Sequence, residues 1–275
     1  MRYLFFIILA FVIFSCDEES SISENFVVEA FLFQGESIDD IKITKAKMYN
    51  SSDTTEEAIS NANVKILFNG SEYQLDYDAL SEKYVMKNSS LDIISGNQYG
   101  LEVTVKERTA TAETVVPTKP VGLTLSNDKI VIPELVLSGA LPTILGNLYE
   151  NARTVVSWDN PDNEYHYLTI KYMEDSENPI FSDEIPSGVG VFFQNFSIVS
   201  EPTKDEKYTT IALSLKNYGR YKVSLFKINQ DYVSLFENQE QDGNELNEPP
   251  SNIINAFGIF SAFASDTTSF EIVKE

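Results

Sequence analysis

The sequence predicts an all-β protein made of two β-sandwich domains behind an N-terminal signal peptide. Apolar and polar residues alternate with a period of two through most of the chain, which is typical of half-buried strands. Asn-Gly and Pro-rich turns separate these short runs, and helical periodicity is almost absent. About 260 residues follow the first 15, which is enough for two β domains with hydrophobic cores.

The N-terminal sandwich domain is predicted over residues 25–118. Its strands are expected at 25–34, 40–46, 62–68, 71–77, 83–87, 98–107 and 109–116. Asn69-Gly70 is the strongest short signal for a two-residue hairpin, so the third and fourth strands should pair. Short strands at this spacing favour an immunoglobulin-like or transthyretin-like sandwich. The Pro-flanked stretch 117–120 marks its end.

The C-terminal β domain is predicted over residues 119–275 as a fibronectin-like sandwich with Trp158 in its core. Separate strands are expected at 154–158, 165–172, 256–263 and 268–273. Residues 209–216 and 220–228 should form a hairpin around Asn217-Tyr218-Gly219. The apolar segment 129–152 is interpreted as a strand followed by a long loop.

One short helix interrupts this β pattern. Tyr232, Leu235 and Phe236 follow helical spacing, Asn229 is a suitable N-cap, and Gly243 can end the helix. The polar run 238–248 is expected to be an exposed loop. Because long loops in compact β domains are often functional, the helix and this loop are the expected interaction surface, with disorder as the alternative.

The first 15 residues are interpreted as a signal peptide. Leu4 to Phe14 is apolar but well short of the roughly 20 residues that span a bilayer. Ile13-Phe14-Ser15-Cys16 resembles a bacterial lipobox, in which cleavage leaves the cysteine as the acylated first residue. Residues 16–24 would then form a lipidated acidic tether. The alternative is an ordinary secreted protein whose signal ends near a lone cysteine.

The acidic triplet after this cysteine bears on location. Asp17, Glu18 and Glu19 resemble the surface-export signal of Bacteroidota lipoproteins, so we expect an outer-membrane protein that faces the cell surface. The triplet could also be a solvated tether. The formal net charge of −22 argues against nucleic acid as a ligand and against attraction to anionic headgroups, so membrane attachment should rest on the lipid.

Residue types that support catalysis are sparse. His166 is the only histidine and Cys16 the only cysteine, so neither a multi-histidine zinc site nor a Cys-His pair is available. No Gly-x-Ser-x-Gly motif is present, and His166 is interpreted as a half-buried strand residue. We expect no enzyme, no cofactor and no metal centre. A carboxylate-based hydrolase is the weaker alternative, since no spacing selects a pair of acids.

Two acidic loops and two short triplets are further candidate sites. Calcium could bind a loop with Asp159, Asp162 and Glu164, or a second loop with Asp242, Asn244, Glu245 and Glu248, although both fit ordinary turns. The Asp-Thr-Thr triplets at 53–55 and 266–268 resemble the Bacteroidota O-glycosylation motif. Thr54 and Thr267 would be the acceptors.

Several motifs in order resemble a known family. They are Val27-Val28-Glu29-Ala30, Ala112-Glu113-Thr114-Val115-Val116-Pro117, Val156-Ser157-Trp158-Asp159-Asn160-Pro161, Phe181-Ser182-Asp183, and Glu248-Pro249-Pro250-Ser251-Asn252-Ile253 with Ala256-Phe257-Gly258-Ile259-Phe260. Together they resemble the Bacteroidota outer-membrane lipoprotein family called domain of unknown function 4249. Ala256 departs from the family's end pattern, which often has glycine there.

The resemblance implies an outer-membrane lipoprotein, often encoded beside a TonB-dependent transporter, without an established enzymatic activity. We therefore expect a binding or accessory subunit, with a TonB-dependent outer-membrane barrel as its partner and an unidentified ligand. The alternative is an adhesin or structural cell-surface module built from the same β domains.

If Cys16 carries the lipid, Cys16→Ala should abolish incorporation of a palmitate analogue and release the protein from the membrane fraction, because acylation requires the thiol. Metabolic labelling followed by fractionation measures both. The substitution Ser15→Ala, which keeps the thiol, serves as the control. An alanine variant at position 16 that still labels would contradict the lipobox interpretation.

Overall fold

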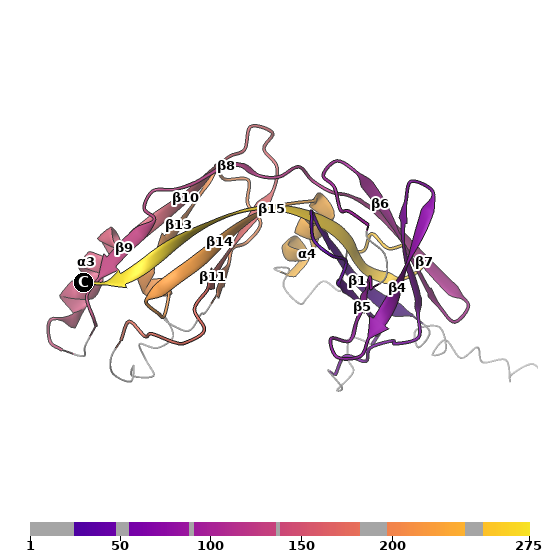
Figure 1. Cartoon of the computed structure of the whole chain (residues 1–275), viewed down its shortest axis with the longest axis horizontal. Helices are drawn as coiled ribbons and strands as arrows, with labels where there is room; N and C mark the ends of the chain where they lie inside the picture. The colour runs from indigo at the N-terminus through magenta and orange to yellow at the C-terminus, as the bar shows by residue number, and fades with distance from the viewer. Residues whose placement is uncertain (1–24, 48–54, 88–90, 136–137, 182–196, 240–249) are drawn as a thin grey trace, which may run out of the picture.

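The computed structural model describes residues 25–47, 55–87, 91–135, 138–181, 197–239 and 250–275. Two β lobes lie along the longest axis of the molecule, and one strand arches from the first lobe into the second (Figure 1). Strands form most of the regular secondary structure of the described residues, which confirms the predicted all-β sandwich class. No helix among them is long and apolar enough to cross a membrane.

The first lobe contains seven strands close to the predicted positions. They are β1 (Phe26–Phe33), β2 (Asp40–Lys45), β3 (Asn63–Phe68), β4 (Ser71–Asp78), β5 (Lys83–Val85), β6 (Gln98–Val105) and β7 (Arg108–Val115). The β3–β4 hairpin is confirmed, and both turn residues have positive φ, 50° at Asn69 and 77° at Gly70. This is the conformation that an Asn-Gly turn supplies.

The rest of the described chain contains the other strands and the helices. They are β8 (Val121–Leu125), β9 (Lys129–Ile132), α3 (Leu141–Asn151), β10 (Arg153–Asp159), β11 (His166–Tyr172), β12 (Ser197–Val199), β13 (Lys207–Ile211), the 3₁₀ turn η2 (Ala212–Ser214), β14 (Gly219–Ile228), α4 (Gln230–Gln239) and β15 (Phe257–Lys274). A separate sheet, ordered β13-β10-β8, packs over the second core.

All other strands belong to one sheet that runs through both lobes. Its order is β12-β11-β14-β15-β1-β2-β5-β4-β3-β6-β7, with β9 paired to β15. The 18-residue strand β15 replaces the two separate strands expected at 256–263 and 268–273. Its first half pairs in parallel with β1, and its second half pairs with β14 and β9.

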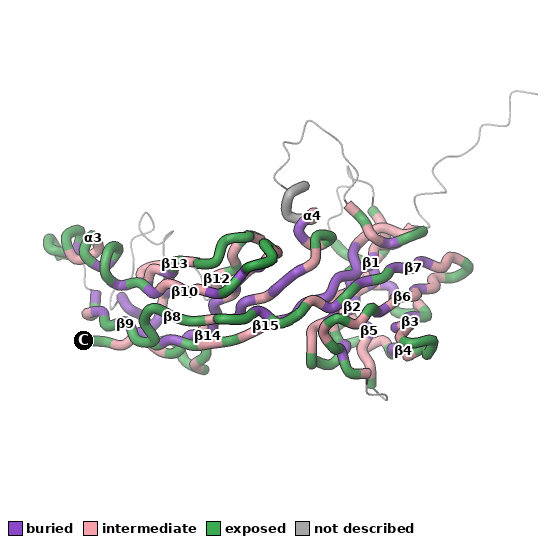
Figure 2. The backbone as a smooth tube through the Cα atoms, turned by 90° about the horizontal axis from the view of Figure 1, so that it is seen from above, coloured by how far each residue is buried: buried purple, intermediate pink, exposed green. Residues whose placement is uncertain are grey.

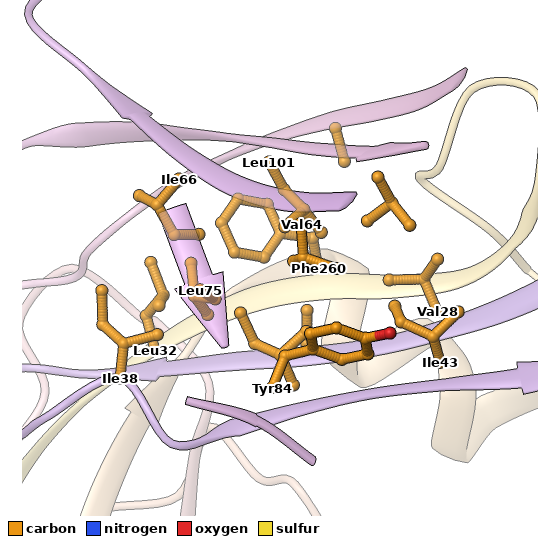
Figure 3. Packing of buried hydrophobic residues seen from close by; sticks show 14 of the residues in the cluster. Val28, Leu32, Ile38, Ile43, Val64, Ile66, Leu75, Tyr84, Leu101 and Phe260 are labelled. Carbon is orange, nitrogen blue, oxygen red and sulfur yellow. The ribbon is translucent and has the colours of Figure 1, made fainter. Parts of the chain in front are cut away.

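Strand β15 contributes to both hydrophobic cores from one face. Phe260 and Ala262 are buried in the first core, and Phe270 and Ile272 are buried in the second. In Figure 3, Phe260 lies between residues of β1 and β2 and residues of β3 and β6. Sequence reasoning placed the whole strand in a domain of residues 119–275, whereas 257–263 complete the core of the first lobe.

The prediction of a hairpin around Asn217-Tyr218-Gly219 is wrong. Strand β13 pairs with β10 in the small sheet, while β14 pairs with β11 and β15 in the long sheet. The connection crosses between sheets because it is anchored inside the core: Asn217 is 1% exposed, and its backbone N–H donates to the Tyr221 hydroxyl at 3.1 Å. Strands β13 and β14 therefore belong to different sheets, although they follow each other in the sequence.

The long loop expected after residue 132 is also wrong in part, because α3 forms there. Pro142 occupies its first turn, where a missing N–H costs little. Leu141 and Leu148 are buried on one face, and Ile144 and Leu145 pack beside them. This spacing of three, four and seven residues is a helical signal in the sequence.

Gly258 sets the distance between β1 and β15. It lies opposite Val28 in the parallel register and has φ of +115°, a region that residues with side chains rarely adopt. A Cβ at this position would overlap the Val28 carbonyl oxygen. Glycine is therefore required where the two strands meet.

Gly258→Ala should lower the free energy of unfolding by at least about 2 kcal/mol, because it adds both backbone strain and overlap. Urea unfolding followed by Trp158 fluorescence measures this. Gly139→Ala is the matched control, since Gly139 has open space around it, and its change should stay within about 0.5 kcal/mol. Equal unfolding midpoints for the two variants would contradict the role of Gly258.

Candidate functional site

Several predicted site residues lie outside the described part of the chain. These are the lipidation residue Cys16, the export triplet Asp17, Glu18 and Glu19, the acceptor Thr54, and the second acidic loop with Asp242, Asn244, Glu245 and Glu248. Their roles stay predictions. The remaining candidates, Asp159, Asp162, Glu164, His166 and Thr267, can be placed.

The first acidic loop is organised as a turn around Asn160. The Asn160 side-chain amide donates to the carbonyl oxygens of Glu164 and Lys204, each at 2.9 Å, and its oxygen accepts the Glu164 N–H. The Glu164 carboxylate forms an ion pair with Lys227. Across the described residues, no three His, Cys, Asp or Glu side chains gather closely enough to hold a metal ion.

Thr267 lies exposed on β15, opposite Ser224 of β14. Its backbone N–H donates to the carboxylate of Asp266 at 3.0 Å. The Asp-Thr-Thr triplet is therefore part of a regular strand with its second residue at the surface. Glycosylation of Thr267 stays a prediction.

His166 is more buried than the sequence suggested, with 2% of its surface exposed. Its Nδ1 lies 3.1 Å from the Glu164 carbonyl oxygen, and its ring centroid is 5.9 Å from that of Trp158. Trp158 is 4% exposed, so the predicted core tryptophan is confirmed. Burial lowers the pKa of His166 below its ordinary value. This histidine therefore belongs to the packing of the second lobe.

The most distinctive surface lies where the two lobes meet. Aromatic rings from four strands and α4 gather on the face of the long sheet opposite the two cores. We call this group the aromatic junction. It comprises Phe31, Phe33, Tyr167, Phe226, Tyr232 and Phe263. Phe33 stacks on Phe263 at 5.1 Å, and Tyr167 stacks on Phe226 at 4.8 Å. Burial raises the pKa of Tyr167 and Tyr232. Such ring pairs add to the stabilisation from buried area.

Helix α4 covers the aromatic junction. It begins at Gln230, as the sequence predicted, and stands out to one side of the long sheet (Figure 2). Val233 is 2% exposed, and the Tyr232 ring meets Phe263 edge-on at 4.9 Å. The Asn229 side-chain amide donates to the Thr114 hydroxyl at 3.1 Å and to the Val115 carbonyl at 2.9 Å. Asn229 therefore ties the start of α4 to β7 of the first lobe.

The segment leading into β15 secures α4 from the other side. The amide of Asn252 donates to the Asp231 carboxylate at 3.0 Å and to the Phe260 carbonyl at 2.8 Å, and its oxygen accepts the Phe260 N–H. Ile254 exchanges two backbone hydrogen bonds with Thr111 of β7. The position of α4 is thus fixed by β7, β15 and the residues between.

Two shallow grooves flank the first turn of α4 and share Asp231. The larger, of about 350 Å³, is lined by Gln98, Glu113, Thr114, Val115, Asn229 and Asp231. The smaller, of about 90 Å³, lies between α4 and Pro250-Ser251-Asn252. Val115 and Ile254 beside them are 47% and 64% exposed. We call α4, these grooves and these two side chains the α4 surface.

The α4 surface combines a fixed helix, exposed apolar side chains and acidic groups, without a deep enclosed cavity at the grooves. This arrangement suits contact with another protein, because small-molecule sites are concave and bury most of the ligand. The sequence predicted α4, but it did not predict that residues of β7 form part of the α4 surface. The sequence signal for this side of the surface is Val115, an apolar residue on the otherwise polar, outward-facing side of the strand predicted at 109–116.

Comparisons with known proteins identify a family and distant β proteins. A family model described as "Domain of unknown function (DUF4249)" matches residues 13–269. A comparison with curated proteins finds no match.

Solved structures with some similarity include a two-domain fibronectin type III segment of chicken tenascin, with 10% identity, coverage of 90% of this chain and 97% of that chain, and a TM-score of 0.23. Titin domains A168–A170 share 10% identity over 89% and 62% of the two chains, with a TM-score of 0.22. A bacterial ice-binding adhesin shares 9% over 91% and 65%, with a TM-score of 0.23. These scores are too low to inform function.

The single histidine predicts a simple pH dependence of stability. Because the folded-state pKa of His166 is lowered, the unfolded chain binds a proton more readily as the pH falls below 6.5, so the free energy of unfolding should decrease from pH 7.5 to about 5.5. Urea unfolding at both values tests this. His166→Gln should remove most of the decrease, whereas an equal decrease in that variant would contradict it.

Proposed function

Because the chain belongs to the family described as domain of unknown function DUF4249, we propose that it is a lipid-anchored protein of the outer membrane that works as a binding or accessory subunit. Its proposed partner is a TonB-dependent transporter barrel, contacted through the α4 surface. The ligand of this subunit is unidentified. Neither a catalytic step nor a cofactor is part of this proposal.

The anchor rests on the lipobox. Eight residues lie between Cys16 and Asn25, where the described structure begins, so the nine residue steps place the first lobe at most about 30 Å from an acylated Cys16. The first lobe lies at one end of the long axis, and the C-terminus, just after β15, lies at the other end (Figure 1). An anchored protein can therefore direct its second lobe away from the bilayer.

The observation that carries the proposed partnership is the fixed position of α4 between the two lobes. The aromatic junction supports α4 from below, and Asn229 and Asn252 hold its first turn from both sides. A preorganised surface loses little conformational entropy on binding, which favours association with a folded partner. The predicted loop 238–248, which continues from α4, would enlarge the same surface.

The principal alternative is an adhesin or structural surface module without a transporter. Much of the aromatic content is committed to the cores, as at Tyr84, Tyr99 and Tyr221, each at most 1% exposed, so aromatic abundance by itself favours neither function. What favours the transporter subunit is the fixed position of α4 beside the exposed Val115 and the acidic residues Glu113 and Asp231.

Two variants test the α4 surface. Deletion of Asp242–Glu248 and the substitution Val115→Glu should both abolish co-purification with the barrel from solubilised outer membranes, since a buried charge at an interface is costly. Val131→Glu is the matched control, because Val131 is 53% exposed on β9 in the other lobe. Blue-shifted Trp158 emission verifies folding in each variant.

Each outcome of this experiment is informative. Loss of the barrel in both test variants, but not in Val131→Glu, supports the proposal. Retention in both variants would exclude the α4 surface from the interface. If the wild-type protein captures no barrel in stoichiometric amount, the adhesin or structural alternative replaces the transporter subunit.

A further inference from the structure

Two adjoining cavities, both open to solvent, lie in the first lobe beside Asn25, where the described chain begins. Their volumes are about 560 and 770 Å³, and Asn25, Glu107 and Arg108 line both of them. Lys106 lies in the turn between β6 and β7 with φ of 54°, and Lys106, Glu107 and Arg108 of this hairpin are among the residues that line the cavities. No role predicted from the sequence involves this turn.

Arg108 is the central cation of this site. Its Nη1 donates to the side-chain oxygen of Asn25, which is a neutral amide. Within the described residues, no carboxylate forms an ion pair with Arg108 or Lys106. A half-buried guanidinium with only one neutral partner retains several N–H donors for an anion.

The local charge differs from that of the whole chain. Among residues lining the cavities, Lys45 is neutralised by its ion pair with Glu57. The other charged lining residues are Lys106, Arg108 and Glu107, two cations against one carboxylate, which leaves a positive excess in a chain with a net charge of −22. An isolated positive excess of this kind favours an anionic ligand, with affinity that falls as salt rises.

Neutral hydrogen-bonding groups surround the two cations. Ser60 and Asn61 line the larger cavity, and Thr109 and Asn255 line the smaller. The planar fork of arginine matches a phosphate group in two parallel hydrogen bonds, while lysine adds a point charge beside it. The donors and charges therefore suit a phosphate ester rather than a neutral ligand.

We propose that the Lys106–Arg108 turn and its two cavities form a phosphate-binding site. The phosphate can belong to a headgroup of the membrane or to a soluble phosphate ester. The lipid source depends on the proposed anchor at Cys16, because the tether keeps this end of the lobe near the bilayer; the soluble source does not.

Calorimetric titration of the purified full-length protein with inorganic phosphate, in a non-ionic detergent, tests the site. Arg108→Gln should weaken binding at least about tenfold, since it removes a charge-assisted pair but keeps a donor for Asn25. Lys106→Gln should weaken it several-fold. Glu107→Gln should strengthen it, because the opposing carboxylate is lost, and Lys129→Gln in the second lobe should change nothing.

Hydrogen exchange of residues 105–109 separates the two sources. The protein is compared in vesicles of phosphatidylglycerol and in vesicles of a galactolipid, which contains no phosphate. If exchange is slower in phosphatidylglycerol vesicles without added phosphate, the ligand is the lipid headgroup. If exchange in galactolipid vesicles becomes slower only when inorganic phosphate is added, the ligand is a soluble phosphate ester. If neither slows exchange and titration gives no heat dependent on Arg108, the proposal is overturned, whether or not Cys16 is acylated.

Discussion

The parallel pairing of β1 with β15 is the constraint on which the rest of the structure depends. It joins segments that are more than 200 residues apart, and it places Phe260 and Ala262 in the first core while the same strand continues to Phe270 and Ile272 in the second. Gly258 permits the close approach to Val28. The two lobes are therefore parts of one hydrogen-bonded sheet, and a hinge between them would require breaking the ladder of β15 rather than bending a linker.

This continuity also determines where the two proposed binding regions lie. The aromatic junction forms only where β1, β14 and β15 run side by side, so α4 is supported at the middle of the molecule. The Arg108 cavities lie in the first lobe, beside the start of the described chain. If the proposed anchor holds the N-terminal end, the proposed phosphate site lies near the bilayer and α4 lies farther along the molecule.

Local features of the fold could be predicted from the sequence, whereas the pairing of strands that are distant in the sequence could not. Alternation identified β1 to β7, the Asn69-Gly70 turn and the buried Trp158, because these depend on neighbouring residues. The same alternation does not say which strand lies beside which. Strand β13 therefore looked like the hairpin partner of β14, although the buried Asn217 sends them to different sheets. The junction and the Arg108 site were missed because each combines residues from distant segments, and α3 was missed although its spacing was readable.

The position of β15 has a consequence for biosynthesis. The first lobe cannot close its sheet or fill its core until residues 257–263 have emerged, although its other strands are complete by residue 115. Pairing over such a sequence distance is slow, because the entropy of closing the intervening chain is lost before the contacts form. During that interval the unpaired edge of β1 is open to other strands, which is a hazard for aggregation. If the chain is exported as proposed, this topology favours translocation of the unfolded polypeptide, followed by folding once β15 has crossed the membrane.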